Sequence, residues 1–240
     1  MSNPAPINTA VILAGGEGRR LFPLTASLPK PLVPVGDRPV IEYPLEQLVR
    51  CGIVKVHVAV NHLADQIRET LGDGSKYGVQ LCYHEEALPL STIGPLGLIE
   101  NLPETFFVMN GDVITNIDLR KVGASHQSSG AIMTVVVCPR TERIDFGVIE
   151  TDETHTVSAF IEKPSYSYLV SSGIYCMSRR LLEVIPKGRR FGFDELVQSL
   201  QQRGERIHTY HFDGYWLDVG RPDDYERANR EISDIRFDIK

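Results

Sequence analysis

The sequence lacks the features that mark several classes of protein. No apolar run reaches the roughly 18 residues of a membrane span, and the N-terminus has neither the basic start nor the long apolar core of a signal peptide. The 4 cysteines form no Cys-x-x-Cys pair, so a metal-binding or redox motif of that type is excluded. Cys82 and Cys176 lie in apolar runs, where a buried thiol is the usual state. We therefore expect a soluble, cytoplasmic protein with no membrane partner.

Positive charge is also scarce. The 25 Lys and Arg residues are outnumbered by 31 Asp and Glu residues, which gives a formal net charge of −6. Broad nucleic-acid binding needs a clustered basic surface, so we expect no nucleic-acid partner. Hydrophobic residues make up 42% of the 240 residues and charged residues 23%, which excludes a disordered chain and is enough for a substantial core.

The first half of the chain alternates short apolar runs with helical patterns. The runs cover residues 9–14, 54–60 and 104–109, and the helical patterns cover residues 39–50 and 61–71. Asn61 is expected to cap the second helix. This alternation predicts βαβ units and an α/β fold with a doubly wound, Rossmann-like sheet.

The second half is richer in strand patterns. Strands are predicted at residues 131–138, 146–151, 156–162 and 172–177, and helices at residues 179–185, 193–203 and 222–235. We expect these extra strands to join the parallel sheet as antiparallel or mixed members. Since no linker or repeat divides the chain, residues 1–240 are interpreted as one domain with two parts that meet at about residue 130.

The stretch from residue 15 to residue 39 is too long for an ordinary connection, and its start is rich in glycine. Its backbone N–H groups could form an anion-binding nest. A dinucleotide fingerprint is excluded because Leu21 stands where a glycine is required, and an ATP-binding P-loop is excluded because residues 1–29 contain no lysine. Arg20 and Lys30 are suitable cations for a phosphate, although two solvated side chains beside a glycine turn would give the same pattern.

Seven longer segments occur in order over nearly the whole chain: Leu13–Thr25, Leu28–Val35, Asn110–Asp112, Phe146–Gly147, Glu162–Pro164, Ser172–Tyr175 and Trp216–Gly220. Together they resemble the signature of the sugar-1-phosphate nucleotidylyltransferases. The ending Gly214–Arg227 is most similar to the mannose-1-phosphate guanylyltransferase branch. Arg19 stands where the family usually has threonine. Arg20 is aligned with the family's arginine because Leu21 follows it.

The resemblance implies a nucleotide-diphospho-sugar transferase fold and a set of site residues. Residues 1–130 would bind the nucleotide, and residues 131–240, with the extra strands, would form a sugar-binding lobe. Asp112 and Asp218 would hold Mg²⁺, which prefers oxygen ligands, while Arg20 and Lys30 would contact the reacting phosphates. The nucleotide-binding residues would be Leu13, Ala14, Gly15, Gly16, Glu86 and Gly94. The sugar-phosphate-binding residues would be Gly147, Glu162, Lys163 and Gly173.

Two positions depart from the family pattern in the base-recognition loop. The family commonly shows Gly-Thr-Ala-Gly there, whereas this chain has Ser91 and Ile93 within residues 91–94.

His57 lies in a predicted strand without a second histidine at a metal-binding spacing, so a structural role is expected.

The activity that the resemblance implies is transfer of a nucleoside monophosphate from a nucleoside triphosphate to a sugar 1-phosphate. The products would be a nucleoside-diphosphate sugar and pyrophosphate. GTP with a mannose- or manno-heptose-type 1-phosphate is the preferred pair, and a glucose-1-phosphate thymidylyl-, uridylyl- or cytidylyltransferase is the alternative. A non-catalytic regulatory subunit that binds sugar nucleotides is a second alternative. The chain ends soon after the last helical pattern, so no appended β-helix is expected. The sequence leaves open whether the protein forms a homo-oligomer.

Overall fold

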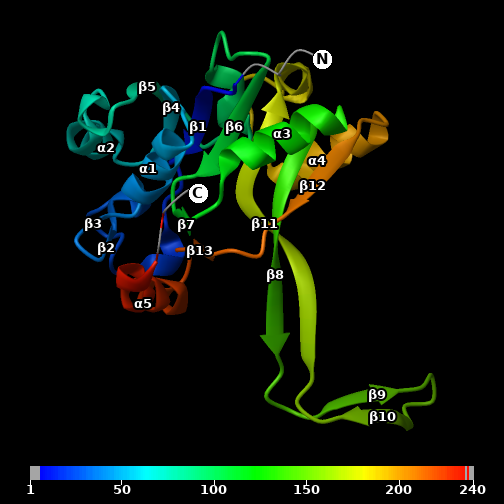
Figure 1. Cartoon of the computed structure of the whole chain (residues 1–240). Coiled ribbons are helices and arrows are strands. Elements are labelled where there is room, and N and C mark those ends of the chain that lie inside the picture. The colour runs from blue at the N-terminus through cyan, green and yellow to red at the C-terminus, as the bar shows by residue number, and fades with distance from the viewer. Residues whose placement is uncertain (1–5, 236, 238–240) are drawn as a thin grey trace.

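The computed structural model describes residues 6–235 and 237, and a mixed sheet forms its centre. In this described part the sheet has seven strands (Figure 1), in the spatial order β12 (Ile207–His211), β8 (Met133–Arg143), β11 (Ser165–Ser178), β6 (Thr105–Asn110), β1 (Thr9–Leu13), β4 (Lys55–Val60) and β5 (Gln80–Glu85). β6, β1, β4 and β5 are parallel to one another, as the alternation in the first half predicts. β11 is antiparallel to β6 and β8, and β12 is parallel to β8. The predicted mixed character of the second half is therefore confirmed.

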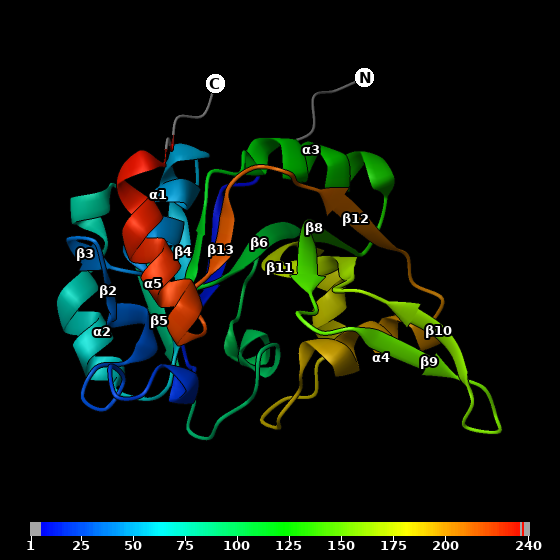
Figure 2. The same cartoon turned by 90° about the horizontal axis from the view of Figure 1, so that it is seen from below.

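Helices cover both faces of the sheet (Figure 2). They are α1 (Glu42–Arg50), α2 (Ala64–Leu71), α3 (Leu119–Ser129), α4 (Phe193–Gln202) and α5 (Pro222–Glu231), with 3₁₀ turns η1 (Arg19–Leu21), η2 (Lys30–Leu32), η3 (Ser75–Tyr77), η4 (Gly94–Leu98), η5 (Arg179–Val184) and η6 (Ile232–Asp234). Successive residues of β1 enter opposite cores, since side chains alternate along a strand. Ile12 packs with α1, α2 and α3, whereas Val11 packs with η4, η5 and α4. This is why β1 is apolar on both faces.

Several elements differ from the sequence prediction. The predicted cap at Asn61 is wrong: α2 begins at Ala64, its N-cap is Leu63 with φ 55°, and the Asn61 amide instead donates to the Glu86 carbonyl at 3.4 Å. α3 and β12 are absent from the sequence prediction, whereas the β-like apolar run at Cys82 lies in β5. The Asp118 carboxylate caps α3 by accepting the Arg120 N–H at 3.0 Å. The helix predicted over residues 222–235 divides into α5 and η6.

A third apolar cluster holds two short β-pairs together. β7 (Val113–Thr115) pairs with β13 (Trp216–Asp218), and β2 (Pro34–Val35) pairs with β3 (Arg38–Pro39). Their buried side chains pack with the α5 residue Ala228. β13 and α5 are thereby packed against β2, at the end of the long loop.

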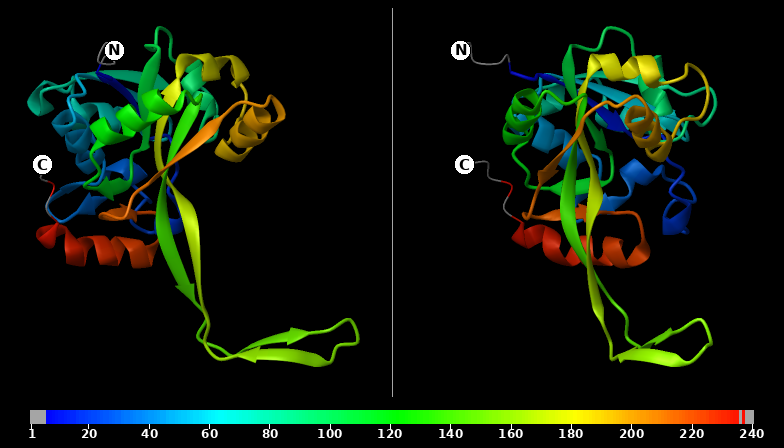
Figure 3. Two further views of the ribbon diagram at one scale, coloured as in Figure 1. Left: turned by 45° about the vertical axis from the view of Figure 1, so that its right-hand side comes forward. Right: turned by 90° about the vertical axis from the view of Figure 1, so that its right-hand side faces the viewer.

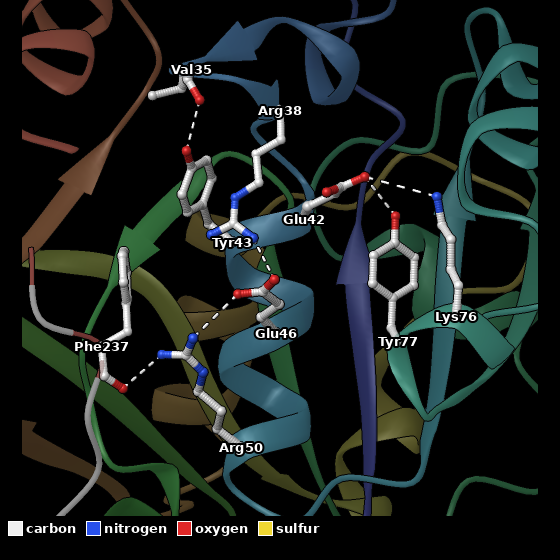
Figure 4. Close-up of polar contacts among 9 residues, drawn as sticks. All are labelled: Val35, Arg38, Glu42, Tyr43, Glu46, Arg50, Lys76, Tyr77 and Phe237. Atoms are coloured by element: carbon white, nitrogen blue, oxygen red, sulfur yellow. Dashed lines mark hydrogen bonds and ion pairs between the residues drawn. The ribbon is translucent and has the colours of Figure 1, made fainter. Parts of the chain in front are cut away.

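Polar contacts from α1 anchor the same region (Figure 4). The Tyr43 hydroxyl donates to the Val35 carbonyl at 2.7 Å, and the Arg38 guanidinium pairs with Glu46 and lies 4.1 Å from the Tyr43 ring. Further contacts join Glu42 to Tyr77 and Lys76, and Arg50 to Glu46 and Phe237. The segment that leaves the long loop is therefore fixed on a rigid helix.

A long arm projects from this body (Figures 1 and 3), and we define it as residues 139–170. It consists of the outer halves of β8 and β11, which stay paired from Pro139 and Leu169 to Arg143 and Ser165, and of the terminal hairpin β9 (Val148–Thr151) and β10 (Val157–Ile161). The predicted strand at residues 172–177 is only the inner end of β11. The arm is thus a continuation of the central sheet.

The structure also bears on the cysteines and on membrane crossing. Cys51, Cys138 and Cys176 are buried and Cys82 is half-buried, and all four are free. Among the described helices, none combines the length and the apolar content that crossing a bilayer requires.

Candidate active site

The carboxyl ends of four parallel strands form one edge of the sheet. Leu13 at the end of β1 lies opposite Asn110 of β6 on one side and Ala59 of β4 on the other, and Val60 lies opposite Glu85 of β5. Beyond β1 the chain proceeds to β4 and β5 on one side and returns to β6 on the other. Ligands of open α/β sheets bind at such a point of reversal. The glycine-rich loop, Asp112 and Glu86 all follow strands that end there.

Two carboxylates and a lysine meet beside β6. Asp112 immediately precedes β7, its carbonyl accepts the Val219 N–H at 2.9 Å, and Asp218 lies opposite Val113 in the β7–β13 pair. The Lys30 ammonium forms an ion pair with the Asp112 carboxylate, and each of these two side chains is only 14% exposed. Three candidate residues from distant parts of the chain are therefore neighbours.

The Arg20 guanidinium lies at the same place. A Cβ atom built at Gly220 would stand 2.6 Å from Asp218 Oδ1 and 3.3 Å from Arg20 Nη2, so both side chains border this glycine. Arg19 has a different environment, since its Nε donates to Glu17 Oε2 at 2.5 Å and its side chain is exposed. The structure therefore brings Arg20, and not Arg19, to the carboxylates.

Electrostatics distinguish Asp218 from an ordinary carboxyl group. Burial, and next the negative charge of Asp112, raise the pKa of Asp218 to about 6, while Lys30 and Arg20 oppose this increase. Two carboxylates that repel each other in a partly buried place are stabilised by a cation between them. No cluster of three or more His, Cys, Asp and Glu side chains suited to a metal occurs among the described residues. Mg²⁺ is commonly held by one or two protein carboxylates together with substrate phosphates, so the Asp112–Asp218 pair fits it.

A second group of candidates lies around the end of β5. The Glu86 carboxylate is buried, and its Oε2 accepts the Leu90 N–H at 2.7 Å. Burial raises the pKa of Glu86. A Cβ atom at Gly15 would approach Glu86 Oε1 to 2.3 Å, so glycine is needed for the close approach of the loop. Gly94, at the start of η4, donates its N–H to the Phe191 carbonyl at 2.9 Å.

The four predicted sugar-phosphate residues are divided between two places. Gly173, with φ 73°, lies at the body, and a Cβ atom there would stand 2.5 Å from Asn110 Nδ2. Gly147, Glu162 and Lys163 instead lie together on the arm, where a Cβ atom at Gly147 would be 3.4 Å from Glu162 Oε2. The Lys163 ammonium is 3.9 Å from Glu162 Oε1. Within one chain, these three residues are not beside Asp112.

Comparison with known proteins adds a decisive observation. The model of the nucleotidyl transferase family matches residues 9–235. The chain belongs to this family. The resemblance to sugar-1-phosphate nucleotidylyltransferases is thereby confirmed.

Individual relatives of this chain support the same grouping. The catalytic subunit beta of mannose-1-phosphate guanylyltransferase from Drosophila pseudoobscura pseudoobscura is 36% identical over 223 residues, which cover 90% of this chain and 60% of that protein. The UTP–glucose-1-phosphate uridylyltransferase of Synechocystis is 31% identical over 253 residues, which cover 95% of this chain and 65% of that protein. The chain thus spans about 60 to 65% of the length of these relatives.

A solved structure confirms the fold. HddC from Yersinia pseudotuberculosis, complexed with GMP-PN, superimposes with a TM-score of 0.74 at 23% identity, covering 94% of this chain and 100% of that chain. The predicted nucleotide-diphospho-sugar transferase fold is therefore confirmed.

Asn61 and Asn110 have no site role in the sequence prediction, yet both lie at this edge of the sheet. Asn61 follows β4, and its Cβ lies 3.3 Å from the position of a Cβ at Gly15. Asn110 ends β6 and packs against Gly173. A usable signal existed, since each asparagine directly follows or ends an apolar strand whose carboxyl end was expected at the ligand-binding edge.

Proposed function

We propose that this chain transfers a nucleoside monophosphate from a nucleoside triphosphate to a sugar 1-phosphate. A phosphate oxygen of the sugar 1-phosphate attacks the α-phosphorus, a new P–O bond forms, and the bond to pyrophosphate breaks. The observation that carries this proposal is the meeting of Arg20, Lys30, Asp112 and Asp218 at the reversal point of the sheet, in a chain of this family.

The protein's own contribution is positioning and charge neutralisation, because phosphoryl-type transfer needs little covalent chemistry from the enzyme. The loop at Gly15 and Gly16 would hold the triphosphate with its backbone N–H groups. Arg20 would bind the departing pyrophosphate, on which negative charge develops. Lys30 would face the reacting phosphates, held in place by its ion pair with Asp112. A general base is not required, since a phosphate monoester is already an anion near neutral pH.

Asp112 and Asp218 would hold Mg²⁺. When bound, the ion would neutralise charge on the α-phosphate and orient it. Leu13, Ala14, Glu86 and Gly94 would surround the nucleoside, with the buried Glu86 as a hydrogen-bond acceptor for it. Glu162 would accept hydrogen bonds from sugar hydroxyls, Lys163 would bind the sugar phosphate, and Gly147 and Gly173 would allow close approach of the backbone.

For the substrates, we propose GTP and a mannose- or manno-heptose-type 1-phosphate. The names of several relatives, guanylyltransferases for mannose 1-phosphate, support this choice. The alternative pair is glucose 1-phosphate with a pyrimidine nucleoside triphosphate, because the similar protein from Synechocystis is a uridylyltransferase for glucose 1-phosphate.

The test is pyrophosphate release from a panel of triphosphates, each mixed with a panel of sugar 1-phosphates and Mg²⁺. We expect turnover with GTP and a manno-configured sugar 1-phosphate that exceeds every other pair by tenfold or more. Turnover with a different pair would correct the substrates. If no pair is turned over by folded protein that still binds a sugar nucleotide, the chain is a sensor and not an enzyme.

A further inference from the structure

The arm carries apolar side chains that its own chain leaves uncovered. Phe146 is 78% exposed and Phe160 is 62% exposed, and Ile149, Val157 and Leu169 are each more than half exposed. Figure 3 shows the arm extending away from the body, so no other element shields its tip. An isolated two-stranded hairpin is at best marginally stable in water, and exposed apolar groups of this size mark interaction surfaces. A partner surface is therefore needed.

The arm also carries site residues that cannot reach the site of their own chain. β8 and β11 pair without interruption from Arg143 and Ser165 to Val137 and Ser171. At ~3.3 Å per residue, the six steps from Ser165 to Ser171 alone measure roughly 20 Å. Lys163 lies beyond the outer end of this ribbon, and a lysine side chain is much shorter than that distance. Each chain thus has the proposed phosphate site on its body, whereas the lysine proposed to bind the sugar phosphate lies at the far end of its arm.

We propose that two copies of this chain exchange arms, so that Gly147, Glu162 and Lys163 of the partner subunit complete the sugar-phosphate side of each cleft. This inference rests on the function proposed above. Exchange of an identical element gives a closed dimer with twofold symmetry. Two such arms lying antiparallel place the tip of one at the base of the other.

The surface at the base of the arm suits that placement. A cavity of about 430 Å³ lies there, lined on one side by residues 138–142 of the arm base and on the other by residues 212–218, which include Asp218. The tip of the partner's arm would therefore arrive beside the metal-binding carboxylates. The same contact would cover Phe146 and Leu169, the apolar groups that are exposed in the single chain.

The backbone at Lys163 fits a clamp for a ligand. Its φ is 45°, in the left-handed region that lysine rarely adopts. Conformations of this kind persist where the surroundings hold them and are common at ligand clamps. Closure of the arm onto its own cleft would instead require bending of the ribbon at the irregularity between Ser171 and Tyr175.

The test is a mixed dimer made from two impaired chains. Asp112→Asn and Lys163→Ala chains, each with a different affinity tag, are co-expressed, isolated through both tags and assayed at sugar 1-phosphate concentrations below the wild-type KM. With exchanged arms, one site of each mixed dimer joins an intact cleft to an intact arm, so we expect about half of the wild-type turnover per dimer. The matched control is a mixed dimer of Asp112→Asn with Arg20→Ala, in which both changes lie in the body and no intact site forms.

Turnover no higher than the mean of the two parent proteins, in a wild type that is active, would overturn the proposal and place the arm on its own cleft. Failure to isolate a mixed dimer would also overturn it. If the wild type has no activity at all, the proposed function fails. Sedimentation then tests separately whether two chains exchange arms. Arm exchange is supported if the wild type is a dimer and its dissociation constant rises at least tenfold in the double variant Phe146→Ser, Leu169→Ser. The Val54→Ser control on the body should keep the wild-type dissociation constant. A wild-type monomer at micromolar concentration contradicts arm exchange.

Discussion

At the residue scale, the site is a set of opposed charges assembled from four separate segments. Asp112 is paired with Lys30, whereas the pKa of Asp218 is raised by burial and by Asp112. Arg20 borders the same glycine as Asp218. The four charges nearly balance before a ligand arrives, so anionic phosphates would need a cation from solution to enter. This balance explains why a metal ion held by Asp112 and Asp218 would favour binding of the triphosphate.

Asp112→Asn should abolish most turnover while the fold survives, because the amide cannot provide the charge that attracts Mg²⁺. We expect a loss on the order of a hundredfold, equivalent to about 2.7 kcal/mol of transition-state stabilisation. Steady-state rates over a Mg²⁺ titration measure it. Asp118→Asn is the control, since asparagine caps a helix as well as aspartate and Asp118 lies outside the site. Wild-type rates in the Asp112→Asn protein at all Mg²⁺ concentrations would contradict the metal assignment.

Gly15→Ala should destabilise the protein by ~1–3 kcal/mol, because the new methyl group would overlap the buried Glu86 carboxylate. Displacing Glu86 would also break its hydrogen bond with the Leu90 N–H. In a Glu86→Ala background this overlap is absent and only the close contact with the Asn61 Cβ at 3.3 Å remains, so the same change should cost much less. Urea unfolding of the four proteins in this cycle gives the interaction energy. An equal cost in both backgrounds would show that the two residues are not in contact.

The sequence was sufficient for some of these residues and not for others. Asp112 and Asp218 follow recognisable segments, and the structure brings them together. Asn61 was misread because a polar residue before a helical pattern resembles a cap, whereas here its amide bonds to Glu86 across the edge of the sheet. Ser91, where the family commonly has glycine, adopts φ 67°, and Ile93 is fully buried in the core. Such substitutions can be interpreted only once the backbone is known.

At the scale of elements, β4 and β5 contain a histidine pair that couples stability to pH. His57 Nδ1 lies 2.8 Å from His84 Nε2, and His57 is only 4% exposed. Burial first, and then the charges of His84 and Lys55, lower the pKa of His57 from 6.5 to about 4. The structural role expected for His57 from the sequence agrees with this packing.

Protonation should therefore destabilise the fold between about pH 6.5 and pH 4. In this range the unfolded chain binds a proton at His57 that the folded protein does not, so the free energy of unfolding falls as the pH falls. The full effect is on the order of 3 kcal/mol. Denaturant unfolding as a function of pH should show a shallower slope for His57→Gln, while His62→Gln, a change at an exposed position, should keep the wild-type slope. Identical slopes for all three proteins would exclude the pair as the cause.

Elements were predictable where burial on both faces imposes an apolar run, as in β1, β4 and β6. α3 was missed because its sequence contains Gly123 and several serines, which are weak helix formers. It forms because Leu119 and Val122 pack on the sheet and Asp118 caps its start. The strand predicted at residues 172–177 missed the outer part of β11, although Tyr166 and Tyr168 alternate there with serines as is typical of a strand. Even that alternation does not reveal that the strand leaves the body.

At the scale of the whole molecule, the body and the arm divide the proposed work. The body contains the glycine-rich loop, the two carboxylates and the buried Glu86, whereas the arm contains Glu162 and Lys163. Binding of the triphosphate should therefore depend on the body alone. Use of the sugar 1-phosphate should depend on the arm as well.

Shortening the arm separates these two dependences. Replacing residues 141–167 by Asn-Gly would join the paired residues Arg140 and Tyr168 through a two-residue hairpin loop and leave the inner halves of β8 and β11 intact. We expect the body to fold and to bind the nucleoside triphosphate with wild-type affinity in calorimetry. The KM for the sugar 1-phosphate should rise at least ten- to a hundredfold, since the loss of the Lys163 contact alone corresponds to about 1.5–3 kcal/mol for one charged hydrogen bond and Glu162 is removed with it. The protein should also be a monomer in sedimentation, because the apolar side chains of the arm tip are gone. A shortened protein with the wild-type KM for sugar 1-phosphate would show that the sugar phosphate is bound entirely by the body, through residues near Gly173 and Asn110.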